Sequence, residues 1–382
     1  MSGSGTLVGE RSQRVTVLPT LTVCGSGAAG RAIAADCALK GCEVTVYDLP
    51  AFGASIVGLA ERGGVEITPD SETTSGKTGF APLAVATTDA SVAVAGADVI
   101  MITAPAMYHD VFMDALLPHL GAGQIVLFNT GYWGCLRQAT RLSDSLPDVT
   151  LAESNIMPYI CQLQGDAVQI GRYKRSFTLA TFPGERIDAV HDVVRHLYDQ
   201  YELVPSVLDS NIAAAGNPPI HVTLAIPVAG YYFDRYGGGK FYQDATIPGA
   251  RLVTAHDAER ERLSRALGCD TFESQFDFDK RAYGYSGRDI AEALRASPHA
   301  DWFATAAYLE QVISEDIVYA YVPMVRLGAA LGVELPVTRG MVDVMGAMLE
   351  RDYWSKGLQL SDLGLAGLGA AGIRRYVITG RA

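Results

Sequence analysis

The chain has 382 residues, of which 49% are hydrophobic and 19% charged. This composition is typical of a globular protein, and the length exceeds what one hydrophobic core usually serves, so we expect two domains. A formal net charge of −12 at pH 7, without any run of Lys or Arg, argues against nucleic-acid binding, which needs basic patches.

Three further features bear on where the protein works. The six cysteines form no CxxC pair or Cys/His cluster with zinc-ligand spacing, so we expect no metal site. No uncharged apolar stretch reaches the roughly 18 residues of a membrane span. Residues 1–14 lack the apolar core of a signal peptide and are expected to form a mobile N-terminal extension. Together these features predict a soluble, cytoplasmic protein.

The first predicted elements surround a glycine-rich turn. Residues 15–23 form an apolar run typical of a β-strand, and residues 31–40 are helix-like. Gly25 permits a tight turn, Gly27 lets the backbone approach a pyrophosphate, and Gly30 lets the helix pack closely on the strand. This order predicts a dinucleotide-binding turn made of Gly25, Ser26, Gly27, Ala28, Ala29 and Gly30.

A second β-run, at 43–47, ends in Asp48, roughly 20 residues beyond the turn, where a carboxylate accepts hydrogen bonds from a ribose 2′-hydroxyl. The same carboxylate repels a 2′-phosphate, and residues 49–52 supply no Arg or Lys to bind one. The sequence therefore favours NAD over NADP as cofactor, unless Arg62 folds back towards this position.

The alternation of strands and helices continues with a strand-like run at 80–87, a short helix at 89–97 and a buried strand at 99–103. Because cofactors bind at the carboxyl edge of such a sheet, the residues that end this strand are expected to contact the cofactor. These residues are Thr103, Ala104 and Pro105.

A helix at about 107–117 and a strand at 124–128 follow, and Asn129 ends that strand. Asn129 is placed to face the nicotinamide or ribose, or it simply helps to close a turn. Further on, segments 167–171 and 176–181 alternate like the two strands of a hairpin. The sequence thus predicts a doubly wound, mostly parallel Rossmann domain over residues 15–206.

Beyond a hinge expected near Leu208, the pattern is nearly all helical, which predicts an all-α substrate domain over residues 207–382. The expected helices cover about 219–233, 251–267, 287–295, 305–332 and 338–349.

His221 differs from the other histidines, most of which we place in polar, helix-surface settings. Asn217 is expected to cap a helix and Pro218 to be its first residue, which puts His221 in the first turn of an apolar helix. Because the positive end of the helix dipole disfavours imidazolium, a nearby carboxylate would be needed to orient and restore it. The alternative is a polar residue that makes one backbone hydrogen bond.

A candidate partner lies in the middle of the long helix expected at 305–332. Two adjacent acids, Glu315 and Asp316, precede an apolar segment, so at least one carboxylate should face the buried side. A buried acid needs a partner, and a histidine is a suitable one. The alternative is a solvated pair of acids on an exposed face.

At this point the chain resembles the octopine/nopaline (opine) dehydrogenases, from the glycine turn nearly to the C-terminus. The matching landmarks are residues 24–30, the Glu-x-x-x-x-Pro-Tyr-x-Cys segment at 153–161, 217–221, 241–242, 259–260 leading to 267–268, and 315–316 leading to 322–323.

The resemblance implies a Rossmann domain, a helical domain, and NAD(P)H-dependent reduction of an imine formed from an amine or amino acid and a 2-oxo acid or other carbonyl. It also implies that His221 and Asp316 form the acid/base pair. The substrate positions that it implies are Cys161, Gln162, Asn217 and Gln311.

Two of these positions depart from the family pattern. Family members commonly carry arginine where this chain has Gln162 and Gln311, and glutamine cannot neutralise a carboxylate. Either another cation has taken over or the substrate is not an ordinary 2-oxo acid; the cations considered are Arg235, Lys240 and Arg339.

The alternatives on the same scaffold are a reductase of a simple ketone, hydroxy acid or cyclic imine, and a non-catalytic NADH sensor. The apolar segment 363–373 could supply the face of a homodimer, or it could pack within the helical domain.

Overall fold

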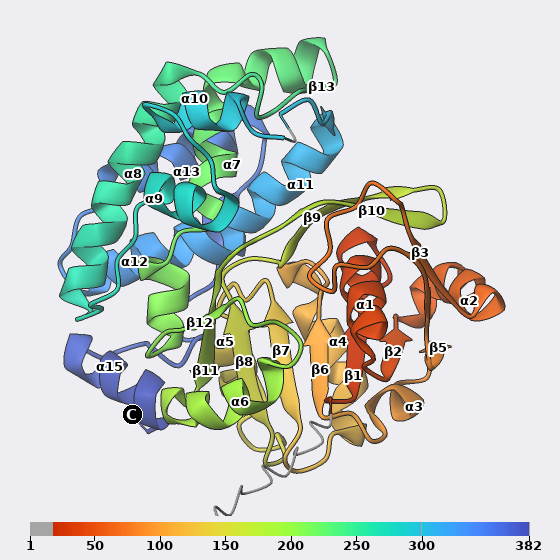
Figure 1. The fold of residues 1–382 in the computed structure, drawn as a ribbon. Coiled ribbons are helices and arrows are strands. Elements are labelled where there is room, and N and C mark those ends of the chain that lie inside the picture. Colours follow the sequence, from red (N-terminus) through yellow and green to blue (C-terminus); the bar gives the residue numbers. More distant parts are fainter. Residues whose placement is uncertain (1–17, 299, 382) are drawn as a thin grey trace, which may run out of the picture.

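The computed structural model describes residues 18–298 and 300–381. The expected N-terminal extension (1–14) and His299 lie outside the described residues. Within the described part, a sheet flanked by helices is followed by a largely helical part that lies over one end of the sheet (Figure 1).

The main sheet has eight strands in the order β12-β11-β8-β7-β6-β1-β2-β5. Its pairs are parallel except β8 with β11, which confirms the predicted mostly parallel α/β fold. The strands are β1 (Leu21–Cys24), β2 (Val44–Tyr47), β5 (Val85–Thr87), β6 (Val99–Ile102), β7 (Ile125–Asn129), β8 (Thr150–Ser154), β11 (Phe177–Phe182) and β12 (Tyr201–Leu203).

Continuous apolar runs make the central strands β1, β6 and β7 buried throughout, as expected for strands covered by helices on both faces. Strand order reverses at β1, which has β2 on one side and β6 on the other, and ligands of such sheets bind at the carboxyl ends of the strands at this point. The covering helices are α1 (Ala28–Lys40), α2 (Gly53–Arg62), α3 (Ala90–Val94), α4 (His109–Leu116), α5 (Gly134–Arg141) and α6 (Ile187–Val194).

A second sheet, in the order β4-β3-β10-β9, corrects two predictions. The predicted strand at 80–87 is two strands in different sheets. The predicted hairpin of 167–171 with 176–181 is wrong, because β10 pairs with β9 whereas β11 pairs with β8 and β12. The actual hairpin turns at Gly165, whose φ of 61° suits glycine. The strands are β3 (Gly64–Ile67), β4 (Gly79–Pro82), β9 (Tyr159–Gln164) and β10 (Ala167–Tyr173).

The second part of the chain is helical apart from one short pair, β13 (Gly238–Gly239) with β14 (Ala304–Thr305). The helix expected at 305–332 is present as α11 and α12, joined by a wider π-helical turn at Ile317–Tyr321. The helices are α7 (Pro218–Ala225), α8 (Ile247–Ala266), α9 (Gln275–Phe278), α10 (Ile290–Arg295), α11 (Ala306–Asp316), α12 (Val322–Ala330), α13 (Pro336–Met348), α14 (Tyr353–Lys356) and α15 (Ala370–Thr379).

The C-terminal helix α15 returns to the first sheet (Figure 1), where the rings of Tyr376 and Phe182 lie 5.1 Å apart. Leu363, Leu365 and Ile373 are buried in the same core cluster as residues of that sheet. The apolar segment 363–373 therefore packs within the chain. The division of the chain at residue 206 stays a prediction.

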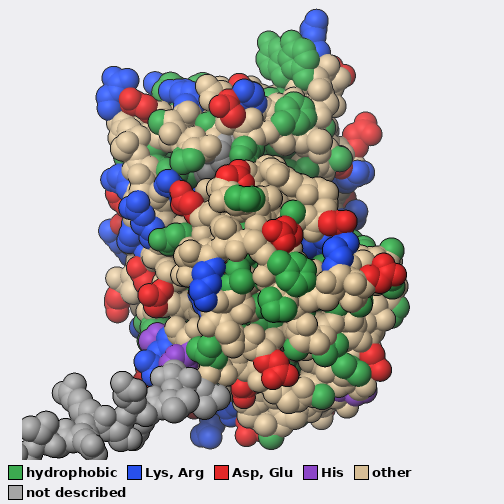
Figure 2. All heavy atoms as spheres, turned by 45° about the vertical axis from the view of Figure 1, so that its right-hand side comes forward, with side chains coloured by type: hydrophobic (Ala, Val, Ile, Leu, Met, Phe, Trp, Pro, Cys, Tyr) green, Lys and Arg blue, Asp and Glu red, His purple; other side chains and the backbone are tan. Residues whose placement is uncertain are grey.

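On the face drawn in Figure 2, acidic and basic side chains are interspersed rather than gathered by sign. This face therefore offers no continuous basic surface to the phosphates of a nucleic acid. In the described part of the chain, no helix is both long and apolar enough to cross a membrane.

Candidate active site

The glycine turn connects β1 to α1 with little room to spare. A Cβ on Gly30 would lie 1.8 Å from the carbonyl oxygen of Gly25, and one on Gly25 would lie 2.8 Å from Thr103 Oγ1. A Cβ on Gly27, by contrast, would meet no atom of the described residues within 4 Å. No side chain caps the start of α1. The turn thus leaves open space beside unpaired helix N–H groups, which fits a pyrophosphate.

Asp48, at the end of β2, is tied to this turn. Its Oδ2 accepts hydrogen bonds from the backbone N–H of Ser26 (2.7 Å) and from the Ser26 hydroxyl (2.6 Å). Arg62 does not fold back to Asp48, since its guanidinium pairs with Asp166 at 3.1 Å. Arg31 donates to the Ser26 carbonyl (2.9 Å) and so braces the turn from the other side.

The end of β6 lies beside the turn. The Thr103 hydroxyl donates to the carbonyl of Cys24 at 2.9 Å, which joins β6 to β1 where both strands end. Directly after Ala104 and Pro105, the backbone of Ala106 is held on both sides: Arg137 donates to its oxygen (3.0 Å), and its N–H donates to Glu315 (2.6 Å).

Asn129 is fully buried, and its side chain is held inside the sheet. The amide oxygen accepts from the Ser154 hydroxyl at 2.7 Å, while the amide nitrogen lies 3.5 Å from the sulfur of Met101. Only the backbone at this position is thus left for a cofactor.

The structure brings His221 and Asp316 together. Nδ1 of His221, in the first turn of α7, lies 2.9 Å from Oδ2 of Asp316, at the end of α11. Asp316 is fully buried and His221 is 8% exposed. Asn217 precedes α7 as predicted, but its side chain makes no capping hydrogen bond.

A third residue completes this group. The hydroxyl of Tyr132, in the turn after β7, donates to Oδ1 of Asp316 at 2.6 Å. The two oxygens of one carboxylate thus hold side chains from both parts of the chain. Sequence reasoning missed Tyr132, because only its position beyond the carboxyl end of a strand marks it.

Glu315 and Asp316 are both buried, so the alternative of a solvated pair is wrong. Burial, aided by the neighbouring charge of Asp316, raises the pKa of Glu315 to about 7. Glu153 was missed as a candidate: it is fully buried, receives hydrogen bonds from Asn211 and from the N–H of Cys135, and burial raises its pKa to about 7.

Two histidines expected on helix surfaces are instead buried, namely His109 and His256. Burial lowers the pKa of His109 to about 3, and that of His256 falls well below its ordinary value for the same reason. Both are therefore neutral structural residues at pH 7. His256 stacks on Tyr321, with ring centroids 4.6 Å apart.

Among the described residues, the predicted substrate positions make no hydrogen bond to one another. Gln162 on β9 donates to Gln169 (2.8 Å), whereas Gln311 on α11 is exposed. Cys161 and Asn217 are half-buried. Of the alternative cations, Lys240 pairs with Asp301 at 2.6 Å, Arg339 lies over the ring of Trp354, and Arg235 is exposed.

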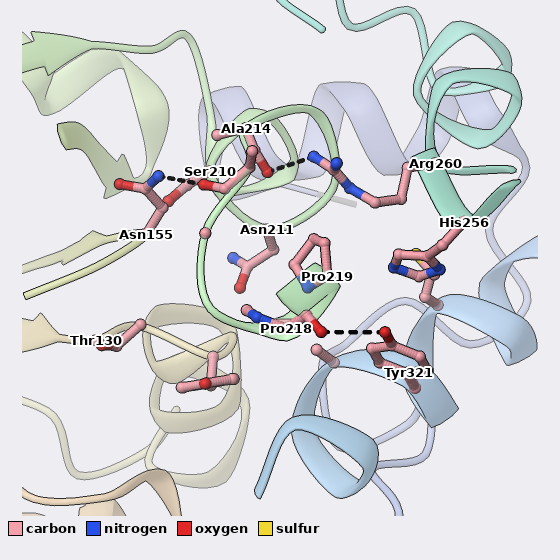
Figure 3. Close-up of a pocket in the computed structure, with 15 residues that line it drawn as sticks. Thr130, Asn155, Ser210, Asn211, Ala214, Pro218, Pro219, His256, Arg260 and Tyr321 are labelled. Carbon is pink, nitrogen blue, oxygen red and sulfur yellow. Dashed lines mark hydrogen bonds between the residues drawn. The ribbon is translucent and has the colours of Figure 1, made fainter. Parts of the chain in front are cut away.

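A cavity of about 40 Å³ is lined by Tyr132 and by residues at the start of α7, and Figure 3 shows how its labelled lining residues lie. This volume holds a few water molecules but no dinucleotide. Across it, the Tyr321 hydroxyl donates to the carbonyl of Pro218 (3.0 Å), and Arg260 donates to Ala214 (2.6 Å). These bonds fix the turn from which His221 projects. Among the described residues, no group of three or more His, Cys, Asp or Glu could hold a metal ion.

Comparison with known proteins adds to this geometry. Residues 203–349 match the NAD/NADP octopine/nopaline dehydrogenase family, alpha-helical domain. The opine dehydrogenase of Arthrobacter sp. (strain 1C) is 28% identical over 367 residues, covering 94% of this chain and 98% of that protein. Protein ocs of Agrobacterium tumefaciens (strain Ach5) is 24% identical and covers 75% of this chain and 80% of its own.

Among solved structures, octopine dehydrogenase in complex with NADH and agmatine superposes with a TM-score of 0.71 at 16% identity, covering 95% of this chain and 98% of that chain. Yersinopine dehydrogenase with bound NADP+ has a TM-score of 0.64 at 15% identity, covering 94% of this chain and 99% of its own. The chain thus matches the helical domain of the octopine/nopaline dehydrogenases over residues 203–349, is similar over most of its length to an opine dehydrogenase, and shares the fold of octopine dehydrogenase.

Proposed function

We propose that this protein is an NAD(P)H-dependent opine dehydrogenase, which reduces the imine formed from an amino group and a 2-oxo acid or other carbonyl. The observation that carries the proposal is the buried His221–Asp316 pair, held by Tyr132 at the sheet edge that also bears the glycine turn. Related structures hold NADH with L-arginine, agmatine or pyruvate, which supports this reaction class.

The residues around the turn fit a dinucleotide. The open side of Gly27 and the uncapped start of α1 would hold the pyrophosphate, and Asp48 would face the adenosine ribose. The carboxylate of Asp48, together with the engagement of Arg62 by Asp166, favours NAD over NADP. When bound, the nicotinamide supplies the hydride.

His221 is the proposed acid/base. Because Nδ1 faces Asp316, Nε2 is left to exchange a proton with the nitrogen or oxygen of the reacting group. Asp316 fixes the orientation of the ring and stabilises its protonated form, as a carboxylate does behind a catalytic histidine. Glu315 holds Ala106, beside the strand ends where the nicotinamide is expected, and so sets the helical part against the cofactor edge.

The test follows NADH oxidation at 340 nm with pyruvate or glyoxylate, with and without a pool of amino acids. We expect turnover that requires both substrates and is lost in His221→Ala and strongly reduced in Asp316→Asn. His119→Ala, which alters an exposed histidine in the short turn after α4, is the matched control. Turnover that persists in His221→Ala would contradict the assigned role.

A second candidate is a reductase of a simple ketone or cyclic imine. It is favoured by Gln162 and Gln311, which replace the charged residues that suit a 2-oxo acid. A ketopantoate reductase from Ralstonia eutropha shares the fold with a TM-score of 0.57. Full turnover without any added amine would favour this candidate.

A further inference from the structure

Lys174 is a buried cation that the mechanism above leaves unused. It directly follows β10, where its backbone N–H donates to the carbonyl of Pro158 (2.8 Å), and its side chain is only 4% exposed. Its ammonium lies over the ring of Tyr283, 5.6 Å from the centroid. Arg172 also donates to the Tyr283 carbonyl (2.8 Å). Lys174 is therefore enclosed between β10 and the helical part.

Among the described residues, this ammonium forms no ion pair within 4 Å, and Asp279 acts on it only from a greater distance. The nearby acid Asp279 is itself buried, and its Oδ2 has no hydrogen-bond partner among the described residues. Its Oδ1 accepts from Gln275 at 2.9 Å. Burial lowers the pKa of Lys174 to about 7 and raises that of Asp279 to about 8. An uncompensated buried cation is costly unless a ligand completes its surroundings.

Two tyrosines place this cluster beside the acid/base pair. Burial raises the pKa of Tyr308, and the neighbouring groups Glu315, Cys161 and Asp316 add to that rise, so Tyr308 lies near both Cys161 and the end of α11. Cys161 in turn lies close enough to Lys174 to affect the pKa of its ammonium.

Tyr242 provides the second connection. Burial raises its pKa, and the neighbouring groups Tyr308, Asp279 and Asp316 add to that rise, while the ring of the adjacent Phe241 lies 6.2 Å from the ring of His221. Lys174 and His221 thus border the same region, between the β9–β10 hairpin and α11.

We propose that Lys174 receives a carboxylate of the substrate, in place of the arginines absent at Gln162 and Gln311. The proposal rests on the proposed function and narrows it to a carboxylic acid as at least one of the two substrates. The other cations considered above are engaged or exposed, whereas Lys174 is buried, close to Cys161 and free of a carboxylate partner.

Binding would also change the protonation of this residue. A substrate carboxylate stabilises the charged ammonium, so above pH 7 its binding should be accompanied by proton uptake. The titratable groups that act on Lys174 are Cys161 and Asp279. Burial raises the pKa of the Cys161 thiol to about 12, so it stays protonated at pH 8, whereas Asp279, with its pKa raised to about 8, adds part of the uptake at that pH.

The first experiment compares Lys174→Met, which keeps the length and removes the charge, with Lys174→Arg and with the surface control Lys77→Met. We expect Lys174→Met to raise KM for the 2-oxo acid or the amino acid at least 30-fold, with a smaller change in kcat and none in NADH affinity. Lys174→Arg should recover most of the loss. An unchanged KM for every carboxylate substrate in folded Lys174→Met would overturn the proposal, although loss of turnover in His221→Ala would still support the reaction.

The second experiment needs neither turnover nor a variant. Oxalate is titrated into the wild-type protein–NADH complex by calorimetry, in buffers of different ionisation heat. We expect uptake of close to one proton at pH 8 and little at pH 6. Oxalate binding without proton uptake at pH 8, or no binding at either pH, would refute the assignment of Lys174. Absence of imine reduction, with proton uptake intact, would instead refute the proposed reaction.

Discussion

The hydroxyl of Tyr132 donates a 2.6 Å hydrogen bond to the carboxylate of Asp316, the same carboxylate that faces His221. Tyr132→Phe would leave one oxygen of a fully buried carboxylate without this donor. Losing a hydrogen bond to a buried charged group costs about 1.5–3 kcal/mol, and about 1.4 kcal/mol corresponds to tenfold in rate. We expect kcat to fall by about 10- to 100-fold, while NADH affinity, measured by fluorescence, is unchanged.

The control for this variant is Tyr201→Phe, because the buried Tyr201 hydroxyl has no hydrogen-bond partner among the described residues. That substitution should leave kcat and thermal stability almost unaltered. If Tyr132→Phe folds and turns over at the wild-type rate, the Asp316 carboxylate does not depend on Tyr132 for its position. A parallel fall in NADH affinity would instead indicate disruption of the cofactor edge.

Two glycines of the turn should respond differently to the same substitution. Gly30→Ala places a Cβ 1.8 Å from the Gly25 carbonyl oxygen. Because α1 can relieve this clash only by moving away from β1, we expect a lower melting temperature and loss of NADH binding. Gly27→Ala meets no described atom within 4 Å and has a φ of −73°, so the fold should survive. Its methyl group would occupy space proposed for the pyrophosphate, and NADH affinity should drop at least tenfold.

Equal melting temperatures for Gly30→Ala and the wild type would contradict the packing argument. Unchanged NADH affinity in Gly27→Ala would show that the pyrophosphate does not bind at this turn.

Cofactor preference depends on the charge of Asp48. The wild type should bind NADH more tightly than NADPH, because a carboxylate repels a 2′-phosphate. Asp48→Asn removes the charge and retains an oxygen that can accept from Ser26, so the ratio of the two affinities should move towards NADPH. The measurement is the Kd of each nucleotide by fluorescence titration. A ratio unaffected by the substitution would show that Asp48 does not face the ribose.

Local patterns were enough to predict the strand–turn–helix unit, which depends on glycine spacing within a few residues. They also singled out His221 and the adjacent acids Glu315 and Asp316, because a buried acid needs a partner, whereas the choice of Asp316 as that partner was implied by the family resemblance. Tyr132, Glu153 and Lys174 could not be found in this way, because their roles depend on contacts with residues distant in the sequence.

Strand pairing was harder to predict for the same reason. Segments 167–171 and 176–181 both alternate, but alternation does not say which neighbour a strand takes, and the chain passes from one sheet to the other between them. His109 and His256 were misplaced because the polarity of flanking residues does not report burial by distant elements.

The free energy of unfolding should depend on pH in a way that Glu315 determines. Its pKa is raised from 4.5 to about 7, so between these pH values the folded protein holds a proton that the unfolded chain has released. Stability from this group is therefore fully present below pH 4.5 and falls as the pH rises to 7, by up to about 3 kcal/mol. Glu315→Gln still accepts from the Ala106 N–H but cannot titrate, so its free energy of unfolding should lose this part of the pH dependence.

The control for Glu315→Gln is Glu310→Gln on the same helix, whose side chain pairs with Arg351 at the surface. Urea unfolding at pH 5, 6, 7 and 8 measures all three proteins. The difference between wild type and Glu315→Gln should shift against the wild type from pH 5 to 7 and level off between 7 and 8, whereas Glu310→Gln should follow the wild type throughout. A constant difference from pH 5 to 8 would mean that Glu315 is ionised in the folded protein, and that the bond to Ala106 joins a carboxylate rather than a carboxylic acid to the cofactor edge.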